Sequence, residues 1–194
     1  RADRYKEVRS DTGISTKLKE VLRRPVGTNP GIVQAQASGA AVKEDRPLIS
    51  LYYYRWDQST NPAGLGADRV YLPFASWEKP GFIDALQELK QEGTEVFGWI
   101  PSITRGNYEE VIGRFLSKMS NLPEDQIFDG ILAGNAGTFR KFRGCGLRMA
   151  GDIPMNLYNA MSVYEAAKLG LESVALSLEL TVKQINTLSS SLIS

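Results

Sequence analysis

From Pro47 onward, the sequence alternates between apolar segments of strand length and amphipathic segments of helix length. The strand-like segments are 47–54, 68–74, 94–101, 128–135, 147–156 and 172–180. The helix-like segments are 79–93, 107–123, 136–143, 160–170 and one that begins after Thr181. Each strand–helix unit takes about 25 to 30 residues, the spacing of a (β/α) barrel. The alternation therefore predicts a parallel sheet built from βα units.

The predicted helix starts carry recognisable capping signals. Asn107 with Glu110 and Thr181 with Gln184 have the spacing of a capping box, in which each side chain bonds the other residue's backbone N–H. Asn159 directly precedes the segment 160–170 and is most simply an N-cap.

Six predicted strands are too few for a closed eight-stranded barrel. We expect an α/β fold of about six βα units over residues 47–194, an incomplete TIM barrel, with a doubly wound sheet as the alternative. Residues 1–46 predict an N-terminal extension or linker with a short basic helix around 17–24. The chain lacks an initial methionine and ends in an uncapped helix. We therefore expect a longer parent protein whose remainder packs against this domain.

Several absences limit the chemistry of the chain. It has no histidine, which excludes Ser-His-Asp and Cys-His nucleophile pairs and the commonest zinc sites. Its one cysteine, Cys145, cannot form a disulfide or hold an iron–sulfur cluster alone. The net charge of +1 gives no argument for nucleic acid or membrane. Without an apolar run of membrane-spanning length or a signal peptide, we expect a cytoplasmic protein with no membrane partner.

Polar residues follow several of the predicted strands. Because ligands of such folds bind at the carboxyl ends of the strands, these side chains are expected to line one pocket. They are Arg55, Arg105, Asn135, Asn156 and Glu179.

Glu179 lies inside the last strand-like segment, between two leucines. Strand alternation over 174–180 would turn the valine and leucines toward the helices and Ser177 and Glu179 toward the barrel axis. A carboxylate there could act as a general base or bind a cation or an amine. The alternative is a structural ion pair with Arg105, Arg148 or Lys183.

Asp152 is a second carboxylate near the carboxyl end of a predicted strand. If it reaches the same cavity as Glu179, the two form a pair of catalytic carboxylates; the alternative is a turn or β-bulge residue after Gly151. Aromatic residues gather nearby in sequence, and we interpret them as core and as lining of the mouth, with base stacking as the alternative. They are Tyr52, Tyr53, Tyr54, Trp56 and Trp99.

Residues 151–188 resemble the collagenase-like U-thirty-two peptidase family. In that family an Asn-x-x-Asn element follows a strand, and a Ser-Pro-Glu-Leu element leads into a later helix. The matching residues here are Asn156, Asn159, Leu169, Gly170, Ser177, Glu179 and Leu180, with Leu178 in place of the usual proline. The segments 66–74, 98–105 and 128–137 also resemble strands of that family's barrel, so the resemblance spans roughly 47–190.

The resemblance implies a TIM-barrel-like fold and a peptide or protein substrate, and it makes Glu179 the first candidate for a catalytic residue. Asp152 is the second candidate because of its position near a strand end. Arg55, Arg105, Asn135, Asn156 and Asn159 are the substrate-binding candidates. Other proteins of the family are similar to RNA-base and quinone-precursor hydroxylation proteins with cysteine-ligated iron–sulfur clusters. Their cysteine signature lies downstream of the Glu-Leu element, so we expect this chain alone to bind no cofactor or metal and to be inactive by itself. Hydroxylation of RNA or of a cofactor precursor and a non-catalytic binding module of a larger protein remain the alternatives.

Overall fold

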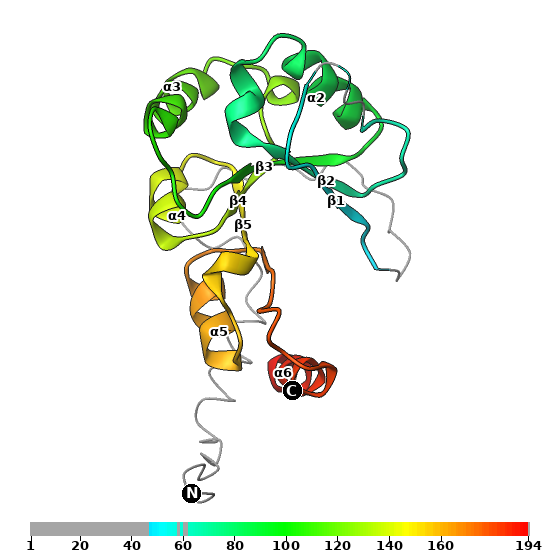
Figure 1. Ribbon diagram of the computed structural model, residues 1–194, viewed down its shortest axis with the longest axis vertical. Coiled ribbons are helices and arrows are strands. Elements are labelled where there is room, and N and C mark those ends of the chain that lie inside the picture. The colour runs from blue at the N-terminus through cyan, green and yellow to red at the C-terminus, as the bar shows by residue number, and fades with distance from the viewer. Residues whose placement is uncertain (1–46, 58, 60–61, 194) are drawn as a thin grey trace, which may run out of the picture.

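The computed structural model describes residues 47–57, 59 and 62–193, so the expected linker and its basic helix lie outside the described residues. In the described part, six parallel strands form one sheet in sequence order, β1 to β6 (Figure 1). The strands are β1 (Ser50–Tyr52), β2 (Arg69–Pro73), β3 (Glu95–Ile100), β4 (Gly130–Ala133), β5 (Arg148–Gly151) and β6 (Ser173–Val174). The predicted number of strands and their parallel arrangement are confirmed.

Helices follow the strands as the periodicity predicts. The α-helices are α2 (Phe82–Gln91), α3 (Tyr108–Met119), α4 (Ala136–Phe142), α5 (Ala160–Lys168) and α6 (Val182–Ile193). Short 3-10 turns are η1 (Phe74–Glu78), η2 (Glu124–Gln126) and η3 (Ile153–Met155). One expectation is wrong: the strand predicted over 172–180 ends at Val174, and only a single bridge between Leu157 and Leu176 extends it.

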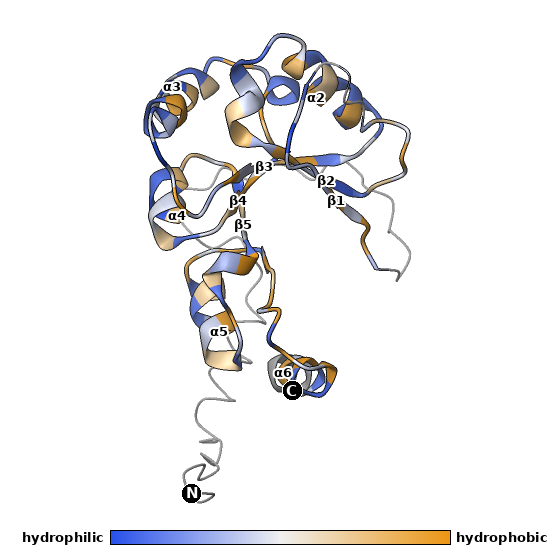
Figure 2. Cartoon of the chain, viewed as in Figure 1, coloured by the Kyte–Doolittle hydropathy of each residue, from blue (hydrophilic) through white to orange (hydrophobic). Residues whose placement is uncertain are grey.

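The sheet curls, and α2, α3 and α4 lie along its outer side (Figure 1). The side chains of Val70 and Leu72 point outward and are fully buried against Phe82 of α2 and Phe115 of α3. Figure 2 shows the matching pattern, with the central strands largely hydrophobic and α2 and α3 carrying both kinds of residue. Burial of this outer layer supplies most of the hydrophobic stabilisation of the fold.

The inner side of the curl has a smaller core made by Phe97, Leu132 and Ala150. A doubly wound sheet reverses its strand order at a switch point, whereas this order runs without reversal. The fold is therefore an incomplete α/β barrel, and the alternative of a doubly wound sheet is wrong.

The starts of the helices show which of the predicted capping residues form caps. Asn159 forms a capping box at the start of α5, with its Oδ1 accepting from Ser162 N at 2.8 Å. Thr181 and Gln184 also bond each other as predicted. The capping box at Asn107 is wrong, because its φ of −82° and ψ of 9° lie far from the extended conformation of a capping residue, and its side chain makes no cap hydrogen bond.

Candidate functional site

A pocket of about 420 Å³ opens at the carboxyl ends of β1, β2 and β3. Tyr54 follows β1, Pro73 ends β2, and Trp99 lies near the end of β3, so the parallel register gathers them at one edge of the sheet. The apolar lining consists of Tyr54, Trp56, Pro73, Trp99, Pro101 and Tyr108. We call this pocket, together with the neighbouring ring of Tyr52, the aromatic mouth.

The rings of the aromatic mouth contact one another in a fixed arrangement. Tyr52 stacks on Trp99 with ring centroids 5.3 Å apart and an interplanar angle of 27°. Tyr54 lies 4.9 Å from Tyr52 and meets Trp99 edge-on at 6.4 Å. The indole Nε1 of Trp99 donates to the carbonyl oxygen of Tyr53 at 2.7 Å, which holds the indole in place. Tyr54 is nevertheless 79% exposed, so the cluster presents an open ring to solvent.

Charged side chains line the same pocket. Lys79 donates from Nζ to the carbonyl oxygen of Trp56 at 2.9 Å, and Asp57 accepts at Oδ1 from Ser59 N at 2.9 Å. Arg55 also lines the pocket, is exposed, and forms no ion pair with any residue that the structure describes. The aromatic mouth thus pairs apolar rings with a small excess of positive charge.

Asp152 follows β5 at this edge of the sheet. Its side chain accepts from Ile153 N at 2.8 Å and caps η3, which confirms the interpretation as a turn residue. Burial raises the pKa of Tyr52, and the negative charge of Asp152 raises it further, although Asp152 does not line the pocket itself. Burial also raises the pKa of Tyr108 to about 12. Both phenols therefore keep their protons at neutral pH and can donate hydrogen bonds.

The two asparagines that follow β4 and precede α5 have structural tasks. Asn135 caps α4 by accepting from Thr138 N at 2.8 Å, and its Nδ2 donates to the carbonyl oxygen of Ser102 at 2.7 Å. Asn159 caps α5 as described above. Asn135 therefore fixes the loop after β3, next to Pro101 of the mouth, whereas Asn159 lines a separate pocket with residues of α6.

Arg105 and Asn156 are exposed loop residues. The carbonyl oxygen of Arg105 accepts from Tyr108 N at 3.4 Å, which ties its loop to the start of α3. Asn156 has a φ of 51° and ends η3, a left-handed conformation that asparagine tolerates better than most residues. Neither residue lines the aromatic mouth.

Glu179 lies in an exposed turn between β6 and α6, not on a strand. Its backbone N–H donates to Ser177 Oγ at 3.4 Å, and the adjacent Leu178 is 81% exposed instead of packed under the helices. The alternation expected for 174–180 fails because β6 ends after two residues. The structural ion pair is absent as well, because Glu179 contacts no charged side chain within the described part of the chain and Arg148 binds other carboxylates.

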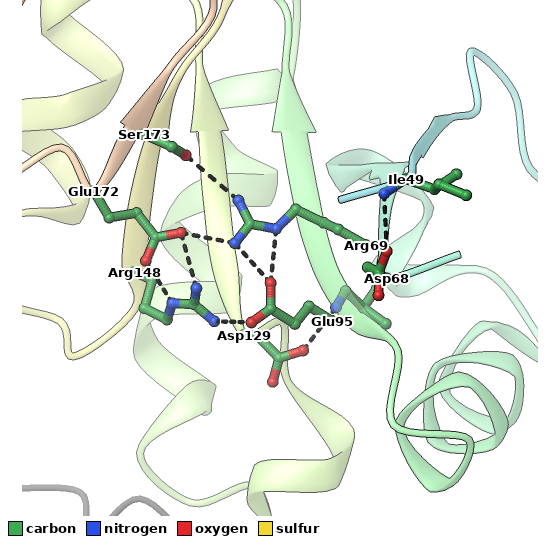
Figure 3. A network of polar contacts seen from close by, with 9 residues as sticks. Ile49, Asp68, Arg69, Glu95, Asp129, Arg148, Glu172 and Ser173 are labelled. Atoms are coloured by element: carbon green, nitrogen blue, oxygen red, sulfur yellow. Dashed lines mark hydrogen bonds and ion pairs between the residues drawn. The ribbon is translucent and has the colours of Figure 1, made fainter. Parts of the chain in front are cut away.

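A network of charges at the amino ends of the strands escaped the sequence analysis (Figure 3). Arg69 reaches across the inner side from β2, with its Nη2 at 2.6 Å from Glu95 Oε2 and 2.9 Å from Glu172 Oε1. Arg148 binds the same two carboxylates, with Nη1 at 2.7 Å from Glu95 Oε1 and Nε at 2.5 Å from Glu172 Oε2. The carbon Cζ of Arg69 also lies 4.1 Å from the ring centroid of Phe97. We call these four charged residues the amino-end network.

The amino-end network is structural. Burial opposes ionisation of Glu95, but hydrogen bonds from Arg148 and Arg69 outweigh it and hold the pKa of Glu95 below its ordinary value. Each member is the first residue of a strand or directly precedes one, and this position is the only signal in the sequence. The pairing itself depends on register and curl, which the sequence pattern does not reveal.

The described residues do not suit a metal centre. Among them, no group of three His, Cys, Asp or Glu side chains is placed to hold a metal ion. A cysteine-ligated iron–sulfur cluster does not fit either, because Cys145 is the one cysteine and burial raises the pKa of its thiol. None of the helices in the described part is long and apolar enough to cross a membrane.

Comparison with known proteins rests on the fold. No protein-family model matches the sequence, and no curated protein matches it. The fold is similar to the solved structure of the U32 peptidase Mk0906, with a TM-score of 0.57 at 11% identity. The similarity covers 81% of this chain and 70% of that one. At this identity the likeness shows a shared fold and nothing more.

Proposed function

We propose that the chain is the barrel-like domain of a U32-type peptidase and that the aromatic mouth receives its peptide substrate. The observation that carries the proposal is the fold similarity to a U32 peptidase over 81% of the chain. The position of the mouth supports it, because enzymes with this architecture bind substrates at the carboxyl ends of the strands. The resemblance of residues 151–188 to the family's Asn-x-x-Asn and Ser-Pro-Glu-Leu elements agrees with it.

Without histidine, a carboxylate is the natural general base of this chain. We assign that role to Asp152, which lies close enough to Tyr52 for its charge to raise the pKa of the phenol. In this scheme Asp152 takes a proton from a water that attacks the peptide carbonyl carbon. The protonated phenols of Tyr52 and Tyr108 then donate hydrogen bonds to the carbonyl oxygen as it gains negative charge. Asp152 returns the proton to the leaving amine.

Glu179 is the second carboxylate candidate, and its exposed turn lets it approach a bound peptide. We propose that Glu179 and the exposed Arg105 and Asn156 bind the peptide outside the mouth. Arg55 binds it at the mouth, Asn135 shapes the bordering loop, and Asn159 lies at a separate pocket beside α6.

Hydrolysis of unstructured peptides tests the assignment, and it is measured on the full-length protein because we expect the chain alone to be inactive. Asp152→Asn keeps the cap of η3, because asparagine caps as well as aspartate does. It should lower kcat/KM by about 100-fold or more, the usual contribution of a general base. Glu88→Gln, on the exposed side of α2, is the matched control and should leave hydrolysis unchanged. Equal activity of Asp152→Asn and the unmodified protein would remove Asp152 from the mechanism.

A second candidate function is a non-catalytic binding module, favoured by the exposed ring of Tyr54 beside Arg55, which forms no ion pair with the described residues. Rings and arginines of this kind also stack the bases of single-stranded RNA, which makes RNA the alternative partner of such a module, in a cytoplasmic setting. Peptide binding without hydrolysis would favour the module. Salt-sensitive RNA binding that is lost in Tyr54→Ala would favour RNA.

A further inference from the structure

The aromatic mouth combines an open ring face and unneutralised positive charge inside one pocket. We propose that it binds the C-terminal residue of a peptide when that residue has an aromatic side chain, with the ring on Tyr54 and the carboxylate at Arg55 and Lys79. This inference rests on the proposed peptide-binding function and names the class of peptide that the mouth selects.

The ring position follows from the geometry of the aromatic cluster. Tyr54 is largely exposed, although it stands at 4.9 Å from Tyr52 and 6.4 Å from Trp99. Its neighbours and the bond from Trp99 to Tyr53 restrict how the rings can move. A guest ring can therefore stack on Tyr54 or meet it edge-on without a rearrangement of the cluster, and such pairs prefer centroid separations of about 4.5 to 7 Å.

The carboxylate position follows from the charges of the same pocket. Arg55 has no ionic partner within the described residues, and its guanidinium can bind a carboxylate through two parallel hydrogen bonds. Lys79 uses one bond on the carbonyl oxygen of Trp56 and keeps further N–H donors. Asp57 is the opposing charge, and its Oδ1 accepts from the backbone N–H of Ser59 in its own turn.

A single peptide residue can place its ring on Tyr54 and its carboxylate at Arg55 and Lys79 only if it is the C-terminal residue. A C-terminal phenylalanine, tyrosine or tryptophan carries its ring and its free carboxylate a few bonds apart. An internal aromatic residue has no carboxylate beside its ring. A pocket of about 420 Å³ is of the size that small ligands occupy, so it suits one such residue and not a folded partner.

Calorimetric titration with short peptides tests the proposal without requiring hydrolysis. The probes are N-acetyl-Gly-Gly-Phe, the same peptide with a C-terminal amide, and N-acetyl-Gly-Gly-Leu. The free acid of the phenylalanine peptide should bind most tightly. The amide should bind about tenfold more weakly, because a hydrogen-bonded ion pair is lost. The leucine peptide should bind roughly two- to twelvefold more weakly than the phenylalanine peptide, which corresponds to the loss of one aromatic pair.

Single variants assign each loss to its residue. Arg55→Gln should reduce the difference between acid and amide, with Lys79 accounting for the remainder, and Tyr54→Ala should abolish the difference between phenylalanine and leucine. The matched controls are Arg140→Gln on α4 and Tyr158→Ala before α5, which are exposed residues outside the mouth. Both controls should keep the differences seen in the unmodified protein.

Two results would overturn the proposal. One is equal binding of the acid and the amide by the unmodified protein. The other is binding of adenosine monophosphate to the aromatic mouth that is lost in Tyr54→Ala, while no peptide binds. The titrations are repeated on Asp152→Asn, so that binding is measured apart from cleavage. Selective binding without hydrolysis by the full-length protein would refute the peptidase and keep this inference, whereas hydrolysis without C-terminal selectivity would do the reverse.

Discussion

The two ends of the same curled sheet differ in whether their arginine side chains are buried in ion pairs or exposed. At the amino end, Arg69 is 7% exposed and its guanidinium is bonded to the carboxylates of Glu95 and Glu172. At the carboxyl end, Arg55 and the ring of Tyr54 are exposed and open to a ligand. The amino end therefore stabilises the curled sheet, so the side chains at the carboxyl end can remain exposed. Barrel enzymes divide stability and activity between their two ends in the same way.

The largest expected effect is the loss of the amino-end network. Arg69→Met should lower the free energy of unfolding by about 3 kcal/mol or more, because it leaves Glu95 and Glu172 half-buried with one cation fewer. Urea denaturation measures the loss. Arg140→Met on α4 is the control and should change stability by less than about 0.5 kcal/mol. A similar small change for Arg69→Met would show that the network does not hold the curl.

Gly130 tests the packing of the inner side at the amino end. A Cβ at this position would lie 2.7 Å from the carbonyl oxygen of Arg148 and closer still to the ring of Phe97. Gly130→Ala should therefore cost about 2 kcal/mol through overpacking. Gly113→Ala in α3 meets no atom within 4 Å and should stabilise the protein by about 0.5 to 1 kcal/mol, because alanine favours the helix. Thermal unfolding of both variants measures these stability changes. Equal effects of the two substitutions would contradict the account.

The pH dependence of stability should follow Glu95. Its pKa in the folded protein lies below the ordinary value of 4.5, so its ionised form stabilises the fold fully above that pH. The contribution is lost as the pH falls through the lower pKa of the folded protein. The stability gap between the unmodified protein and Glu95→Gln should therefore shrink from pH 6 toward pH 3, as measured by thermal unfolding. A constant gap would mean that Glu95 is not held ionised by the network.

The fold was predictable because its signals are local. The change of hydrophobic period located six strands and the helices between them, and the caps at Asn159 and Thr181 marked true helix starts. The wrong predictions lie at positions where the backbone conformation of one residue or one short segment decides the local structure. Asn107 is too close to a helical conformation to cap α3, and β6 ends after two residues, so Glu179 is on a turn.

The sequence indicated an edge of the sheet for the candidate site, but not the arrangement of its side chains. The rule that ligands bind at the carboxyl ends of parallel strands pointed to the edge where the aromatic mouth opens and Arg55 lines it. The stacking of Tyr52, Tyr54 and Trp99 depends on strands far apart in the sequence. The pairing of Arg69 with Glu172 likewise depends on the curl of the whole sheet, so neither could be seen from spacing.

The smallest expected effect on stability is at the mouth. Tyr54→Ala should change the free energy of unfolding by less than about 0.5 kcal/mol, because the ring is 79% exposed. Urea denaturation of Tyr54→Ala beside Arg69→Met would show the contrast between the two ends. A loss of 3 kcal/mol or more from Tyr54→Ala, comparable to the loss expected for Arg69→Met, would mean that the aromatic mouth is part of the core.

The most direct test of this division is a titration of N-acetyl-Gly-Gly-Phe followed by amide and indole resonances in NMR. The indole N–H of Trp99 donates to Tyr53, so it gives a distinct signal within the mouth. We predict shifts of this indole and of the amides of Tyr54 and Arg55, with the amides of Arg69, Glu95 and Arg148 unmoved. Shifts confined to the amino-end residues, with an unmoved Trp99 indole, would contradict the account.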